Sequence, residues 1–109
     1  MSLIVGWAEV PAADPSTPVK LTVREDAGGR VGLIRMAPGT VVPTHSHDAD
    51  EVFVFVAGAA TVTLDGQPRP VGPGDVVLFG AGVAHGIEAG AEEVRLVAMV
   101  APNDLWSPA

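Results

Sequence analysis

Short apolar segments separated by turn residues run along almost the whole chain. In "VKLTVRE", Val19, Leu21 and Val23 alternate with polar residues, which is the period of a half-buried strand. No window of about 11 residues or more holds a helical period, because Gly or Pro interrupts every candidate. The pattern therefore predicts an all-β protein.

About ten short strands are expected, and turn residues separate them. Their ranges are 2–10, 19–25, 31–36, 40–47, 51–58, 60–64, 68–71, 74–80, 83–89 and 92–100. The tail, 101–109, is expected to form one helical turn or none. Segments such as "VFVFV" and "VRLVAMV" are apolar on both faces, so one face is expected in a barrel interior and the other against a second sheet or a partner subunit. So many short strands predict a sandwich or a closed barrel.

The composition narrows the possible partners. Six basic residues against 13 acidic ones give a formal net charge of -7, which repels phosphate backbones and argues against nucleic-acid binding. The chain has no cysteine, so it has no disulfide framework and no thiolate metal site. No apolar run approaches the ~20 residues of a membrane span, and the first residues lack the features of a signal peptide. We expect a cytoplasmic protein without a membrane partner.

The three histidines of the chain stand out against this background. His45 and His47 are two residues apart on an expected strand, so their rings point the same way and can converge on one metal ion. After a short acidic turn, Glu51 opens the next strand, and an antiparallel return would bring its carboxylate beside the two rings. His85 begins another short strand and is placed to supply a fourth ligand. Burying these groups without a partner would be costly, so a divalent transition metal is expected.

The same residues form two motifs that resemble those of the cupins. The first motif is Gly39, five residues, His45-Ser46-His47, three residues, Glu51, six residues and Gly58, with every fixed position matched. The second motif is Gly74, five residues, Gly80-Ala81-Gly82, two residues, His85, three residues and Ala89. Gly80 stands where the family has proline, and Ala89 where it has asparagine. Neither position is a metal ligand, so these departures affect the rigidity of a turn more than metal binding.

The resemblance implies an all-β fold: a small single-domain cupin of the cupin 2 type, with a double-stranded β-helix or jelly-roll barrel. Residues 1–109 are expected to form this one domain, with motif 1 at 39–58 and motif 2 at 74–89. The implied metal ligands are His45, His47, Glu51 and His85. The family usually forms homodimers in which one sheet packs on another, and the apolar start "LIVGW" and the two-sided apolar strands fit that arrangement.

Alternation along the strands predicts an apolar substrate pocket beside these ligands. Its expected lining is Met36, Val41, Phe53, Phe55, Val62, Leu64, Leu78 and Ile87. Alternation places either Leu33 and Arg35 or Ile34 and Met36 inward; the apolar pair is favoured, whereas an inward Arg35 would anchor an anionic substrate. The orientation of Arg95 is left open.

Two acidic residues and five glycines are expected to have structural roles in turns. Asp48 and Asp50 are expected to form a solvated turn, with a smaller chance of orienting a ligand. The expected role of Gly58, Gly66, Gly72, Gly74 and Gly82 is to supply positive φ in turns.

Three imidazoles and one carboxylate leave open positions on a six-coordinate ion, which suits Fe, Mn, Ni or Cu more than a closed structural Zn site. The predicted lining holds almost no acid or base besides the ligands, and metal-centred oxidation needs few such groups. The favoured hypothesis is therefore a small dioxygenase-type oxidoreductase acting on a compact, chelating organic molecule. One alternative is a non-oxidative metal-dependent isomerase or lyase, for example on a sugar acid. The other is a binding or sensor module that holds a small molecule without turnover.

Overall fold

Nine β-strands and one short 3-10 helix make up residues 2–102, the part of the chain that the computed structural model describes. The helix η1 covers Trp7–Glu9, and the strands are β1 (Val19–Asp26), β2 (Gly29–Met36), β3 (Val41–His45), β4 (Ala49–Ala57), β5 (Ala60–Leu64), β6 (Gln67–Val71), β7 (Val76–Phe79), β8 (His85–Ala89) and β9 (Val94–Pro102). They form two antiparallel sheets, one in the order β1-β2-β9-β4-β7 and the other in the order β3-β8-β5-β6.

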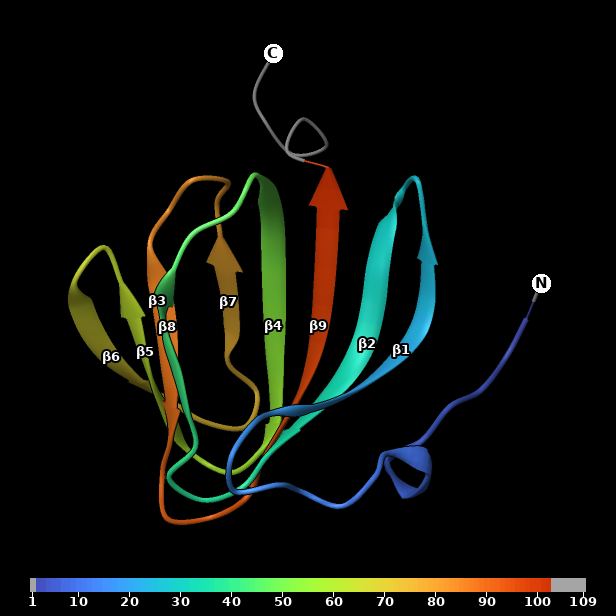
Figure 1. The fold of residues 1–109 in the computed structure, drawn as a ribbon, viewed down its shortest axis with the longest axis horizontal. Coiled ribbons are helices and arrows are strands. Elements are labelled where there is room, and N and C mark those ends of the chain that lie inside the picture. The colour runs from blue at the N-terminus through green and yellow to red at the C-terminus, as the bar shows by residue number, and fades with distance from the viewer. Residues whose placement is uncertain (1, 103–109) are drawn as a thin grey trace.

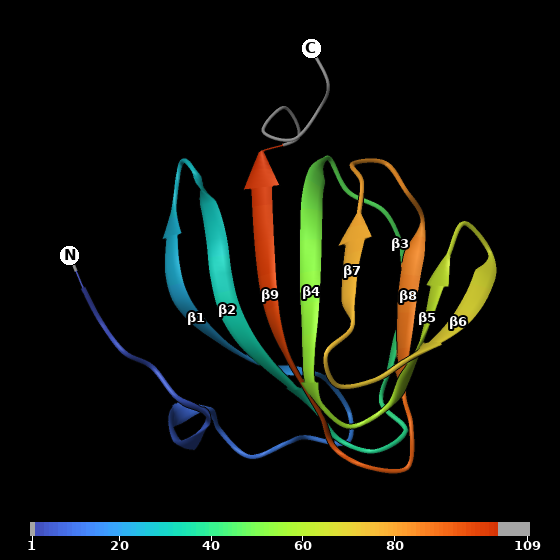
Figure 2. The ribbon, with the colours of Figure 1, turned by 180° about the vertical axis from the view of Figure 1, so that it is seen from behind.

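The two sheets form the walls of a jelly-roll barrel. Figure 1 shows them converging at the lower end of the view and spreading apart at the upper end, and Figure 2 shows the same arrangement from behind. The all-β prediction is confirmed, since nine of the ten expected ranges contain a strand. No helix in residues 2–102 is long and apolar enough to cross a membrane. The prediction for the tail lies outside the described residues from position 103 onward.

The strand expected at 2–10 is wrong. Here the chain forms η1, and the Glu9 carboxylate accepts a hydrogen bond from the backbone N–H of Gly6. The guanidinium of Arg35 donates to the carbonyl oxygen of Trp7 at 3.0 Å, so this segment is held by a side chain and not by a neighbouring strand. An apolar segment becomes a strand only when its backbone pairs with one, and the sequence alone did not reveal the lack of such a partner.

The core lies between the two sheets and is built by strict alternation. Phe79 is 0% exposed, and its ring centroid lies 4.9 Å from that of Phe53. The pairing of Phe53 with Val77 and of Glu51 with Phe79 puts these side chains on the inner face. Leu78 is consequently on the outer face and 56% exposed, so its predicted place in the pocket is wrong. The four residues of "VVLF" are all apolar, and their hydrophobicity alone does not fix which pair points inward.

Positive φ values occur at four of the five glycines for which they were expected: Gly58, Gly66, Gly74 and Gly82. At Gly58, with φ 77°, a Cβ would lie 2.2 Å from the carbonyl oxygen of Glu93, so the turn from β4 to β5 requires glycine. Gly72 has no positive φ, and that expectation is wrong. Its backbone N–H instead donates to the Asp75 carboxylate at 2.8 Å, in a turn open to other residues.

Candidate metal centre

Three strands and one connection bring the histidines and Glu51 to one end of the barrel. His45 is the last residue of β3, and it faces His85, the first residue of β8, across the antiparallel pair. His47 follows in the connection to β4, and Glu51 lies on β4. The expected antiparallel return of this strand beside β3 is wrong, because β3 and β4 belong to different sheets. The Glu51 carboxylate therefore approaches the histidines from the opposite wall of the barrel.

The three histidines form one compact cluster. One ring nitrogen from each of His45, His47 and His85 can be chosen so that all lie within 4.8 Å of one another. The Oε1 atom of Glu51 lies 3.3 Å from Nε2 of His47 and 3.6 Å from Nε2 of His85. The structure thus brings together all four residues that the sequence singled out, with Glu51 in contact with two of the three rings.

Backbone carbonyl groups orient all three rings in the same way. Each Nδ1 lies between 2.8 and 3.1 Å from a carbonyl oxygen two residues away. The pairs are His45 with Pro43, His47 with Ala49 and His85 with Val83. A carbonyl oxygen can only accept, so each Nδ1 carries the proton and donates it, which leaves the Nε2 lone pair free to bind a cation. Such bonds from the far ring nitrogen are the usual support of histidine ligands.

The environment of His85 tests whether a metal ion fits this cluster. The side chain is 2% exposed, and its Nε2 atom is buried without a hydrogen-bond partner among the described residues. The Phe79 ring stacks on it, with the ring centroids 4.3 Å apart, so one face of the imidazole is apolar. A buried nitrogen lone pair without a partner is costly, and a cation at the cluster would satisfy it. Three imidazoles and a carboxylate could therefore hold one divalent transition metal ion.

Asp50 has a positioning role that the sequence analysis underestimated. It is 8% exposed, and its Oδ1 atom accepts the backbone N–H of Ala81 at 2.8 Å. Next to this bond, the N–H of Gly82 donates to the carbonyl oxygen of His47 at 2.8 Å. These two bonds tie the loop that precedes His85 to the start of β4 and to the connection that carries His47. The expectation of a solvated turn is wrong for Asp50, because its carboxylate points into the protein and not into water.

Replacing Asp50 by Ala is expected to weaken divalent-metal binding by about tenfold or more, because the loop before His85 loses its anchor. Asp48, two residues earlier, is exposed and forms no hydrogen bond with the described residues, so Asp48→Ala is the matched control with the same loss of charge. Isothermal titration of both variants with manganese or zinc measures the effect. Equal affinities in the two variants would show that the Asp50 bond does not position the site.

A cavity of about 450 Å³ opens beside the cluster and includes all three histidines and Glu51 in its wall. Four of the eight predicted pocket residues line it: Met36, Val41, Phe53 and Ile87. Ile34 also lines it, which confirms the preference for an inward Ile34 and Met36. Of the other predicted residues, Phe55 is packed in the core, and Val62, Leu64 and Leu78 line a second cavity. Half of the predicted lining residues therefore lie in the wall of this cavity, and their role as a substrate pocket stays a prediction.

Two basic residues in the cavity wall, Lys20 and Arg30, were missed by the sequence analysis. Lys20 pairs with Ile34 across β1 and β2, so the two side chains share the inner face of the sheet. The available signal was weak: Lys20 is the only lysine of the chain and alternates with apolar residues, which does not reveal the face that points inward. Arg35 lies outside the cavity, where its Nε atom is 3.5 Å from the carboxylate of Glu93.

Residues 32–101 match the model of the cupin domain family, and the chain belongs to this family. The matched segment contains both histidine motifs and six complete strands of the barrel, β3 to β8, together with most of β2 and of β9.

Curated relatives are similar to the chain over parts of their lengths. An uncharacterized protein of Streptomyces coelicolor is 35% identical over 68% of this chain and 70% of its own length. Two proteins of Ruegeria pomeroyi named as dimethylsulfoniopropionate lyases, DddQ and DddW, are 37% and 29% identical over 49% and 60% of this chain. The matches span only 27% and 43% of these two lyases.

Solved structures with the same fold cover almost the whole chain. An uncharacterized protein with a double-stranded β-helix domain from Klebsiella pneumoniae aligns with a TM-score of 0.84 and 23% identity, over 95% of this chain and 93% of its own. KdgF from Halomonas sp. aligns with a TM-score of 0.82 and 21% identity, over 94% of each chain. At this identity the similarity concerns the fold alone.

Proposed function

We propose that this cupin is a metal-dependent enzyme that binds one divalent transition metal through His45, His47, Glu51 and His85. The observation that carries the proposal is the shared orientation of the three rings, each with its Nδ1 within hydrogen-bond distance of a carbonyl oxygen. A carbonyl oxygen can only accept, so Nε2 is the nitrogen that each ring has left to bind an ion. A bound metal of this kind polarises oxygen atoms of a small molecule placed in the adjoining cavity. The ion is Fe, Mn, Ni, Zn or Cu, since the donor set accepts each of them.

A non-oxidative lyase or isomerase reaction is the best-supported activity. The dioxygenase hypothesis depended on a cavity almost without protein acids, bases or charged groups, whereas Lys20 and Arg30 lie in its wall. Two of the curated relatives are named as lyases. The dioxygenase remains the second candidate, supported by the apolar wall of Ile34, Phe53 and Leu96. The third candidate is a binding or sensor module, which holds a small molecule in the same cavity without turnover.

Metal analysis followed by an activity screen distinguishes these candidates. Protein purified without an affinity tag is expected to contain one of the five metals. It is then incubated with small organic acids, dimethylsulfoniopropionate among them, under nitrogen and under air. Product formation under nitrogen without oxygen uptake is the expected result. Product that appears only with oxygen uptake would establish the dioxygenase, and thermal stabilisation without product would establish the binding module.

We further propose that the protein forms a homodimer through the outer face of the five-stranded sheet. Pairings across the sheet place apolar residues of all five strands on this face, and Leu33 is the buried one among them: Val19, Leu21, Val31, Leu33, Val52, Val54, Val76, Leu78, Val97 and Met99. The exposed part of this face, where Val76 is 64%, Leu78 56% and Met99 36% exposed, is an apolar patch of the kind that a partner covers. A second copy presents an identical face, so the contact closes on itself with two-fold symmetry.

Light scattering is expected to give twice the 11.1 kDa mass of the chain. The Val76→Glu variant is expected to give the monomer mass, because the substitution places one carboxylate in each half of the contact. Thr61→Glu adds the same charge at an exposed position of β5 in the other sheet and is expected to leave the dimer intact. A wild-type mass of 11.1 kDa at micromolar concentration would contradict the dimer.

That residues 1–109 form one domain, and that the protein is cytoplasmic, remain predictions.

A further inference from the structure

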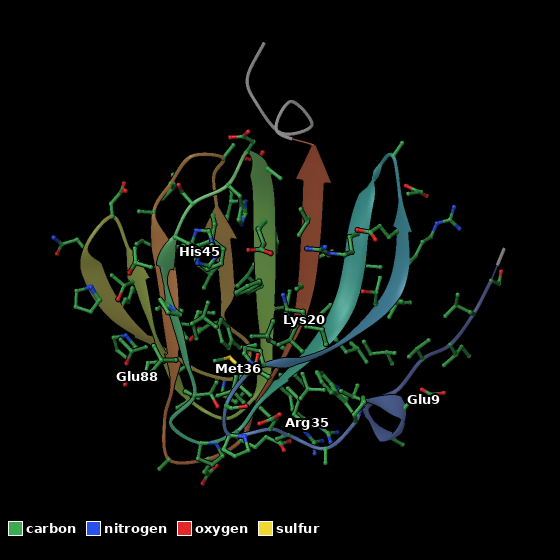
Figure 3. All side chains as sticks on the ribbon, in the orientation of Figure 1. Glu9, Lys20, Arg35, Met36, His45 and Glu88 are labelled. Atoms are coloured by element: carbon green, nitrogen blue, oxygen red, sulfur yellow. The ribbon has the colours of Figure 1, made fainter. Side chains whose placement is uncertain are left out.

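Lys20 and Arg30 lie in the wall of the cavity that contains the histidine cluster. Lys20 belongs to β1 and Arg30 to β2, both in the five-stranded sheet. Together with Glu51 they also line a smaller cavity of about 20 Å³, which places the two cationic residues near the carboxylate of the cluster. Figure 3 shows Lys20 in front of β9 and β4, above Met36 and lower in the view than His45.

Neither Lys20 nor Arg30 is held by a strong ion pair or hydrogen bond to the described residues. Within residues 2–102, Lys20 makes no ion pair and no side-chain hydrogen bond. Arg30 has one partner, Glu25, at 3.5 Å, and the two side chains are 44% and 62% exposed. Exposed ion pairs of this kind contribute little to stability, so Arg30 can exchange Glu25 for another anion.

The charge of the cavity is opposite to that of the whole protein. The chain has six basic residues and a net charge of -7, yet two of the six line this cavity. Glu51 is the one carboxylate among the described residues in its wall, and it contacts two of the histidines. The cavity is thus cationic within an anionic protein, and such local fields select the charge of a ligand.

We propose that Lys20 and Arg30 form an anion subsite that binds a carboxylate of the substrate, while the other end of the substrate faces the histidine cluster. The proposal rests on the proposed function, because it assigns the substrate class of the same cavity: small organic acids with a second polar group. A carboxylate carries one charge, which one free ammonium and a shared guanidinium can balance. A phosphate dianion would need more donors, and the described residues place neither a helix N-terminus nor a glycine-rich loop in the wall.

The probes are two pairs of molecules that differ only in the charge of the far end. Malate and 2-hydroxyglutarate each carry a 2-hydroxy acid group, which can chelate a metal, and a second carboxylate. Their 4-amide and 5-amide keep the chelating group and neutralise the second carboxylate. Isothermal titration of the metal-loaded protein gives the affinity of each acid relative to its amide. The wild-type protein is expected to prefer at least one of the acids by about tenfold.

Lys20→Met is expected to lower this preference to about twofold or less, because the neutral side chain keeps most of the length and loses the charge. Arg30→Met is expected to lower it partly. Arg69→Met removes the same charge from β6, outside this cavity, and is expected to preserve the preference. The metal content and the unfolding temperature of every variant are measured in the same preparations and are expected to match those of the wild type.

The outcomes separate the subsite from the metal site. An unchanged preference in Lys20→Met, with normal metal content, would overturn the subsite and leave the proposed function standing. If the protein contains no metal and still shows a preference for the acid that depends on Lys20, the proposed function is overturned and the subsite stands. Failure of the wild-type protein to bind either acid at millimolar concentration would overturn the subsite as well.

Discussion

The His47→Ala protein is expected to bind divalent metal at least about 100-fold more weakly than the wild type. One imidazole leaves the cluster, and Glu51 loses one of its two histidine contacts. The barrel is expected to stay folded, because the His47 side chain is 34% exposed and fills no part of the core. Metal content after dialysis, measured by mass spectrometry, and isothermal titration with manganese, iron or zinc record the loss.

The matched control is Ser46→Ala, an exposed position between the two histidines of the first motif. Its metal affinity and unfolding temperature are expected to equal those of the wild type. Wild-type metal content in the His47→Ala protein would show that this histidine is not a ligand. A wild-type protein that takes up none of the five metals would end the metal-dependent proposal.

The Phe79→Ala protein is expected to lose about 3–5 kcal/mol of its free energy of unfolding. Phe79 is completely buried, packs edge-on against Phe53 and stacks on His85, so its removal leaves a cavity between the core and the candidate metal site. A loss of this size is a large part of the ~5–15 kcal/mol that stabilises an ordinary domain. Urea denaturation followed by circular dichroism measures it through the shift of the midpoint.

Val41→Ala serves as the comparison for Phe79→Ala. Val41 is 53% exposed on β3, and its truncation is expected to cost about 0.5 kcal/mol or less. A similar small cost for Phe79→Ala would show that β7 does not turn Phe79 into the core. In that case Leu78 would be the inward residue, as the sequence analysis had expected.

The sequence by itself determined the class of fold and the residues of the candidate metal site. Short alternating segments separated by glycine and proline cannot form helices, and they pair as strands because pairing satisfies their backbone groups. Two residues apart on an extended segment means one face, which predicted that His45 and His47 meet. Glu51 and His85 were identified by their positions in the two motifs that resemble those of the cupins. The alternation of each strand and the residue order within each motif are local in the chain, so both can be recognised without knowledge of the fold.

Only the tertiary structure decided which wall each group comes from and which face of a strand points inward. The chain crosses between sheets after His47, so Glu51 reaches the cluster from the opposite side of the barrel. The four residues of β7 are all apolar: Val76, Val77, Leu78 and Phe79. Only the pairing of β7 with β4 decides that Phe79 points into the core. The same holds for Lys20 in the cavity wall. Alternation along β1 separates its two faces, but only the packing of the two sheets decides which face is the inner one.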